Sequence, residues 1–231
     1  FDVRAALAAQ AKSPMGYGSE FRKGEILSPL VQHHPRWPRL AKILKNGSQW
    51  PTSPISEEDR LADLHEALEF GNHKGASNEL TLLKELILED VIHGYILPLP
   101  LHKIDKIPGA ILSPMNIVHQ DTIDETGKII PKDRLTHDQS FIFHGSNTTV
   151  NSRLDKSALI PCQFGWVIRR LINWAVAARR KHPKQRIFAT KVDFKSAFRR
   201  CHLHHRTAVQ SCTQLPDMNL ALMALRLTFG G

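Results

Sequence analysis

The chain has 231 residues, of which 42% are hydrophobic, and its formal net charge at pH 7 is +9. This length and composition are enough to bury a core in one or two domains, which excludes a disordered tail. No run of about 18 apolar residues occurs, and the first residues lack the basic-then-apolar order of a signal peptide, so we predict no membrane partner.

The positive charge is concentrated in one part of the chain. Between Lys128 and Arg206 there are 17 Lys or Arg residues against four acids, a net charge of +13. Such a block repels itself unless an anion or solvent compensates, so we expect a nucleic acid or a nucleotide phosphate as partner. A solvated basic surface without a partner is the alternative.

The cysteines and the ends of the sequence bear on the cellular context. Cys162, Cys201 and Cys212 form no CxxC pair, and an odd cysteine count is typical of a reducing compartment, so we expect an intracellular protein, cytoplasmic or nuclear. Because the sequence starts without Met and stops directly after an apolar run, we expect a piece of a longer protein. No pattern indicates the oligomeric state.

Residues 1–108 are predicted to form a mainly helical and irregular lead region. Residues 1–55 are rich in Pro and Gly, so we expect an extended, loosely ordered segment there, apart from a short helical turn over residues 40–44. Ser56, followed by three acids, is typical of a helix N-cap, and a second helix is predicted over residues 78–92. The positions expected to face inward on these two helices are Leu61, Leu64, Leu68, Leu80, Leu83, Ile87 and Val91.

After Gly94 the pattern changes to short strands interrupted by prolines. Strands are predicted over residues 95–100, 110–114 and 116–120. A turn at residues 125–128 and a further strand over residues 129–138 predict a hairpin, whose basic residues are Lys128, Lys132 and Arg134.

Residues 163–181 are predicted to form a helix packed on the core, because their apolar residues share one face. Its basic C-terminal end could stabilise the helix dipole or bind phosphate. The next predicted strand, residues 186–193, ends on Asp193. A carboxylate at the end of an apolar strand needs a partner, either a metal ion or a neighbouring cation such as Lys191, Lys195 or Arg199.

Three segments together resemble the reverse transcriptase family, particularly the enzymes of retrotransposons. Residues 134–140, with Asn151 after them, are similar to a strand of the fingers in which an Arg and an Asp four residues later precede a loop ending in Asn. Residues 191–199 are similar to the first palm motif, and residues 226–230 to the start of the next one. The resemblance covers about residues 110 to 231.

This resemblance implies an α+β fold in which residues 109–231 form the fingers and the first part of the palm of a right-hand polymerase, with an antiparallel sheet and packed helices. It implies template-directed, RNA-directed DNA synthesis from deoxynucleoside triphosphates on an RNA or DNA template-primer. The implied cofactor is a pair of Mg²⁺ ions, with Mn²⁺ as a possible substitute. A non-catalytic nucleic-acid-binding module, including a decayed retroelement remnant, is the alternative.

The family's site residues carry over by position. Asp193 would be the catalytic residue and metal ligand, helped by the backbone carbonyl of Phe194. Asp138 and Asn151 would orient the fingers. The remaining implied nucleotide-binding residues are Lys132 and Arg134 at the triphosphate, Phe198 beneath the sugar, and Phe229 and Gly230 in the nucleotide pocket.

The sequence also departs from the family pattern. Thr228 stands where the family usually has Pro, and Asp133 places an acid beside the implied phosphate contacts. The family's second catalytic motif, an aromatic-x-Asp-Asp turn, is expected after residue 231, so we expect this piece alone to be inactive as a polymerase.

The Cys and His residues between 201 and 205 also suggest zinc. We expect this segment to be a strand, which would put Cys201 and His205 on one face and His202 and His204 on the other. That alternation disfavours a zinc site.

Overall fold

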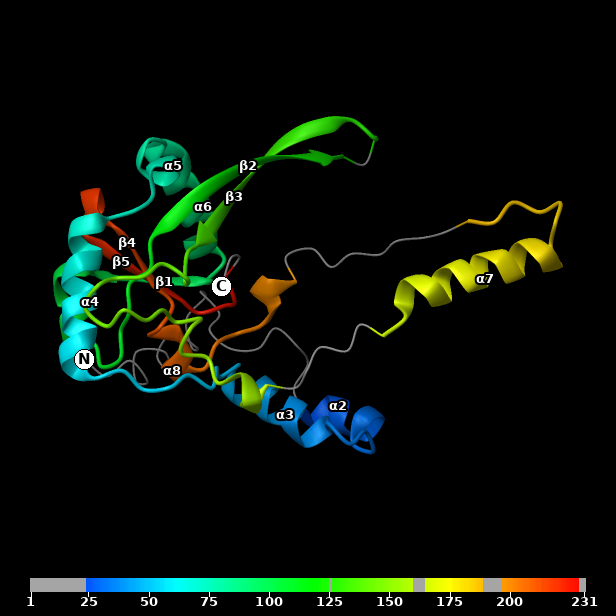
Figure 1. Ribbon diagram of the computed structural model, residues 1–231, viewed down its shortest axis with the longest axis horizontal. Helices are drawn as coiled ribbons and strands as arrows, with labels where there is room; N and C mark the ends of the chain where they lie inside the picture. Colours follow the sequence, from blue (N-terminus) through cyan, green and yellow to red (C-terminus); the bar gives the residue numbers. More distant parts are fainter. Residues whose placement is uncertain (1–23, 125, 160–164, 189–196, 229–231) are drawn as a thin grey trace. The chain divides into compact units, whose positions relative to one another are not determined.

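The computed structural model describes residues 24–124, 126–159, 165–188 and 197–228. The chain divides into two compact units, one formed by residues 1–155 with 196–231 and the other by residues 156–195 (Figure 1). The first unit combines helices with two small antiparallel sheets, so the α+β class predicted from the sequence is confirmed.

The first unit contains six α-helices among its described residues. They are α2 (Gly24–Val31), α3 (Trp37–Asn46), α4 (Glu57–Phe70), α5 (Lys74–Ser77), α6 (Leu80–Ile92) and α8 (His205–Ala208). The prediction of an extended segment over residues 1–55 is therefore wrong for α2, and α3 is longer than the short helical turn expected over residues 40–44. Its prolines were interpreted as helix breakers, but Pro38 lies in the first turn of α3, where a missing N–H costs no hydrogen bond.

The start of α4 matches the prediction, whereas its buried face does not. Ser56 Oγ accepts a hydrogen bond from Asp59 N at 3.1 Å, as expected for an N-cap. Leu64 is buried, but Leu61 and Leu68 are 42% and 39% exposed. The reason is Arg60, which turns inward.

Arg60 is only 2% exposed. Its guanidinium contacts Glu57 Oε1 at 2.5 Å and donates hydrogen bonds to the carbonyl oxygens of Asp105 and Ala110. A pattern search for apolar residues cannot find a buried arginine that is satisfied in this way.

Helix α6 packs beside the base of the predicted hairpin. Leu83 and Ile87 are buried and Val91 is partly buried, as predicted, whereas Leu80 is 40% exposed at the first residue of the helix. The buried pair joins Met115, Ile117 and Leu135 of the hairpin in one apolar cluster.

A three-stranded antiparallel sheet forms the centre of the unit. Its order is β1 (Ile96–Pro100), β5 (Leu220–Ala224), β4 (Cys212–Leu215). Leu101 N donates to Asn219 O and Leu225 N donates to Tyr95 O, so odd-numbered residues of β1 face β5. Pro98 and Pro100 therefore take positions directed away from β5, where the edge strand has no ladder partner to lose.

The predicted hairpin is confirmed and is longer than expected. Strands β2 (Met115–Ile123) and β3 (Ile129–His137) pair antiparallel from Met115 opposite His137 to Ile123 opposite Ile129. The two strands run side by side to a narrow turn (Figure 1). Gly127 in this turn has a φ of 85°, which explains why glycine is favoured there.

The second unit contains α7 (Val167–Lys181), close to the predicted helix. Within this unit no residue of α7 is buried and Ile168 is 76% exposed, so its packing on a core stays a prediction. Among the described residues of this unit, only the short 3-10 helix η2 (Lys156–Ala158) accompanies α7, so its apolar face has no regular element of the unit to pack on.

The strand predicted over residues 186–193 has two outcomes. Residues 186–188 are not in a strand, and Phe188 is 78% exposed. Residues 189–193 lie outside the described residues. The predicted boundary at residues 108 and 109 stays a prediction, although β1 from one side pairs with β5 from the other.

Candidate functional site

The β2–β3 hairpin has two chemically different faces. Because side chains alternate along a strand, Lys132 and Arg134 share one face with their pairing partners Gln120 and Val118. Lys132 is exposed and Arg134 is half-buried. The hairpin therefore carries two neighbouring cations on one side, and their role at a triphosphate stays a prediction.

Asp133 lies on the opposite face of the hairpin. Its Oδ1 is 2.6 Å from His119 Nδ1, and His119 Nε2 is 2.8 Å from Glu79 Oε1. The hydrogen bonds to Asp133 and Glu79 raise the pKa of His119 above its usual value. The acid that departs from the family pattern is thus engaged by His119, on the side away from the two cations.

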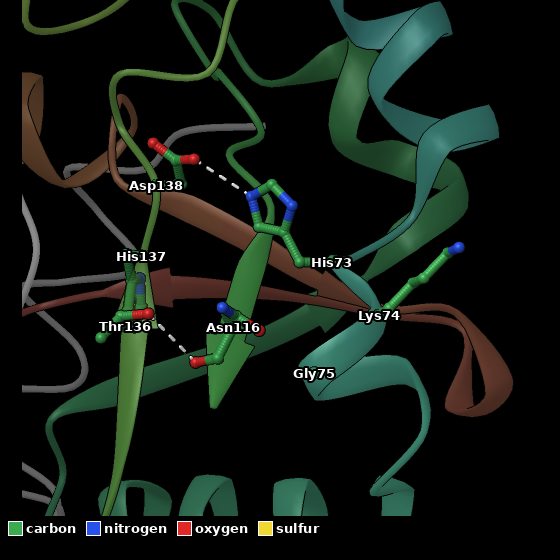
Figure 2. Close-up of a pocket in the computed structure, with 7 residues that line it drawn as sticks. All are labelled: His73, Lys74, Gly75, Asn116, Thr136, His137 and Asp138. Atoms are coloured by element: carbon green, nitrogen blue, oxygen red, sulfur yellow. Dashed lines mark hydrogen bonds and ion pairs between the residues drawn. The ribbon is translucent and has the colours of Figure 1, made fainter. Parts of the chain in front are cut away.

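An open pocket of about 650 Å³ lies at the base of the hairpin (Figure 2). Its lining residues come from the segment that leads into α5, from α5 itself, and from the paired ends of β2 and β3. They are His73, Lys74, Gly75, Asn116, Thr136, His137 and Asp138. A Cβ on Gly75 would lie 2.2 Å from Asn116 Oδ1, so a larger residue here would require the Asn116 side chain to move.

Asp138 spans one side of this pocket. Its Oδ2 is 3.0 Å from His73 Nε2, and its Oδ1 accepts a hydrogen bond from Ser140 N at 3.1 Å (Figure 2). Asn151 Nδ2 donates to Ser140 Oγ at 2.7 Å. Asp138 and Asn151, both expected to orient the fingers, therefore meet on Ser140.

His137 is the buried member of the pocket, with 1% exposure. Burial, and secondarily the positive charge of Arg199, lower its pKa to about 3, so the imidazole is neutral at physiological pH. Neither ring nitrogen has a hydrogen-bond partner among the residues that the structure describes. The effect of Arg199 indicates that the segment containing this arginine runs close to the base of the hairpin.

Arg199 ties the same segment to α6 through an ion pair with Asp90. Both side chains are 15% exposed. Burial raises the pKa of Asp90, and the charge of Arg199 opposes this rise. Phe198 begins the 3-10 helix η3 (Phe198–Arg200) and is 57% exposed, beside the arginine that anchors the segment.

Four of the predicted site residues lie outside the described residues. They are Asp193, Phe194, Phe229 and Gly230. Arg226, which opens the third motif, is 2% exposed, and its guanidinium lies 6.0 Å from the centre of the Tyr95 ring. Among the residues that the structure describes, no group of three or more His, Cys, Asp or Glu side chains could hold a metal ion.

The strand expected across Cys201 and the histidines after it is wrong. This segment consists of the end of η3, isolated bridges at His202 and Leu203, and helix α8. His204 caps α8, with its side chain accepting from Arg206 N. The capping geometry of His204 competes with strand formation, which periodicity alone did not indicate.

Sequence reasoning missed several residues of this region. His73 lies 65 positions before its partner Asp138, and Asp90 lies 109 positions before Arg199, so no local pattern connects either pair. A carboxylate in the last turn of α6 is a weak signal for a buried cation elsewhere, but it does not identify Arg199.

Comparisons of the chain with protein-family models, with curated proteins and with solved structures found no match. None of the helices in the described part of the chain is long and apolar enough to cross a membrane.

Proposed function

We propose that this chain comprises the fingers and the first part of the palm of a reverse-transcriptase-like nucleotidyltransferase. The observation that carries the proposal is the position of Lys132 and Arg134 on one face of a hairpin whose base adjoins Arg199. Arg199 follows Asp193, the proposed catalytic residue, by six positions in the sequence. The closeness of Arg199 to the base of the hairpin supports the proposal, and Asp193 itself lies outside the described residues.

In this proposal the hairpin holds the triphosphate of the incoming deoxynucleotide. Arg134 offers a planar fork of donors and Lys132 a mobile ammonium group, which suits an anion with several oxygens. Asp133 supports this role, because its contact with His119 keeps a negative charge on the other face. His73 and Ser140 hold Asp138 in place, which supports an orienting rather than a substrate-binding role.

The proposed cofactor is Mg²⁺, which would stabilise the attacking and departing oxygens of phosphoryl transfer when bound. Among the described residues no carboxylate cluster takes over this function. The proposal therefore assigns the ion to Asp193 and the carbonyl of Phe194. Phe198 would lie under the sugar and Phe229 with Gly230 would line the pocket.

The experiment is binding of a fluorescent deoxynucleoside triphosphate to the chain in the presence of Mg²⁺. Arg134→Ala should weaken binding by about tenfold or more, because a charge-assisted hydrogen bond to phosphate is lost. Lys103→Ala is the matched control, since Lys103 is an exposed cation outside the hairpin, and should change binding less than about twofold.

Asp193→Asn distinguishes the proposal from a non-catalytic nucleic-acid-binding module. The proposed site predicts that this variant loses the Mg²⁺ dependence of nucleotide binding. The net charge of residues 128–206 favours the alternative, a non-catalytic module. If that alternative is correct, nucleic acid should bind in a salt-sensitive way, and Asp193→Asn should leave this binding unchanged. If nucleotide binding depends on Mg²⁺ equally in the wild type and in Asp193→Asn, the proposed nucleotidyltransferase site is refuted.

A further inference from the structure

A second pocket, of about 330 Å³, lies between α3 and the segment around His204. No residue of the hairpin contributes to it. Its lining includes the charged, amide and aromatic residues Arg39, Lys42, Asn46, Gln49, Trp50 and His204.

Backbone hydrogen bonds hold the two walls of this pocket together. Ser48 N donates to His202 O at 2.8 Å, and His204 N donates to Ser48 O at 2.9 Å. Trp50 N donates to Thr207 Oγ1 at 3.0 Å, across 157 positions of sequence. The segment that carries Trp50 is therefore fixed on the residues that lead into α8.

Gly47 allows the close approach of these walls. Its φ is 87°, and a Cβ at this position would lie 2.5 Å from the backbone of both Leu203 and His204. No side chain fits there without moving the backbone. The pocket is thus a built feature of the fold rather than a gap between loosely packed loops.

The mouth of the pocket is cationic. Residues 26–56 contain four basic residues, Arg36, Arg39, Lys42 and Lys45, and no Asp or Glu. Arg39 and Lys42 are exposed, and neither forms an ion pair within the part of the chain that the structure describes. Both cations therefore remain available to an external anion.

We propose that this pocket binds a nucleoside phosphate, with Arg39 and Lys42 at the phosphate and Trp50 against the base. Cations beside an aromatic ring form the usual recognition surface for a phosphorylated base, since every base has a face that stacks. Asn46 and Gln49 supply amide groups for base edges, and the volume falls in the range of small-molecule sites. A free nucleotide and one unit of a single strand share this chemistry.

The first experiment measures anisotropy of a short fluorescent oligothymidylate bound to the whole chain. Arg39→Ala and Lys42→Ala should each weaken binding by about fivefold or more and reduce the slope of log affinity against log salt by about 0.7. Lys45→Ala is the matched control, because Lys45 lies on the same helix but does not line the pocket. Equal losses in all three variants would overturn the proposal.

Competition with thymidine monophosphate identifies the source of the ligand. Displacement of the oligomer by the monophosphate assigns the pocket to free nucleotides, and failure of displacement assigns it to a strand. Either result supports the proposal when the variants at Arg39 and Lys42 are impaired.

The second experiment tests the aromatic contact. Crosslinking with a 5-bromodeoxyuridine oligomer should label the peptide that contains Trp50, and Trp50→Ala should weaken binding by at least about fivefold. Trp50→Phe keeps a stacking ring and should retain most of the affinity, which separates lost stacking from lost folding. Labelling confined to other peptides would overturn the proposal.

The proposal for the hairpin and the proposal for this pocket can be refuted independently. Arg134→Ala should leave the crosslink at Trp50 unchanged, because Arg134 does not line this pocket. Loss of the crosslink in Arg134→Ala would instead assign the labelled strand to the hairpin and overturn the second site.

Discussion

The two sheets of the first unit differ in how many of their strand residues are buried. In the β1–β5–β4 sheet every residue of β4 and nearly every residue of β5 is buried. In the β2–β3 hairpin only the base is buried, and the end near the turn exposes apolar residues such as Ile123 and Ile129. The three-stranded sheet therefore stabilises the fold through burial, whereas the hairpin carries mostly exposed side chains towards its turn.

The largest expected effect tests the stabilising role of the three-stranded sheet. Leu222 is fully buried between Pro98 and Thr213, so Leu222→Ala should lower the free energy of unfolding by about 2–5 kcal/mol. Ile129→Ala, at a side chain that is 65% exposed near the hairpin turn, should cost less than about 0.5 kcal/mol. Urea denaturation of both variants measures the difference, and equal losses would remove the distinction between the sheets.

The next effect tests the buried base of the hairpin. The pKa of His137 is lowered to about 3, so the unfolded chain takes up a proton at this site first as pH falls below about 6.5. Stability should therefore decrease between about pH 6.5 and 3, by up to about 1.4 kcal/mol per pH unit from this group.

The variant His137→Leu removes this titration, and its unfolding free energy should fall less steeply over the same pH range. His202, whose pKa burial lowers to about 4, contributes in the same direction, so some decrease remains. His65→Leu, at an exposed histidine, is the matched control for the exchange of an imidazole for a leucine side chain. A slope in His137→Leu identical to the wild type would contradict burial of a neutral imidazole.

The smallest effect concerns the middle of the hairpin, where His119 contacts Glu79 and Asp133. Because its pKa is raised in the folded state, its favourable contribution is complete below about pH 6.5 and is lost as pH rises through the folded value. Asp133→Asn should bring the pKa of His119 down towards its usual value. Titration by NMR measures this shift, and an unchanged pKa would show that Glu79 alone holds the imidazole.

The parts of the fold that sequence patterns predicted are those with local signals. The N-cap at Ser56 and the hairpin around Gly127 each depend on residues within a few positions of one another. Strands β4 and β5 were missed because they are four and five residues long and buried on both faces, so they show no alternation. α7 shows the limit of periodicity, which located the helix but predicted burial that its unit does not provide.

In the candidate site, too, local sequence patterns indicated some features, whereas others depend on contacts between distant parts of the chain. Lys132 and Arg134 could be placed on one face from strand alternation alone, and Asp138 followed from the spacing to Arg134. The contact of Asp138 with His73, and that of His119 with Glu79, depend on tertiary packing. A single sequence carries no signal for contacts across 65 or more positions.

The two prolines of β1 have a consequence for the behaviour of the protein at high concentration. An edge strand with free N–H groups can recruit a strand from another molecule and start aggregation. In β1 the outward positions are Ile96, Pro98 and Pro100, so only one of the three carries an amide proton. A strand from another molecule could therefore form almost no hydrogen bonds with backbone N–H groups along β1. This disfavours extension of the three-stranded sheet at its β1 edge.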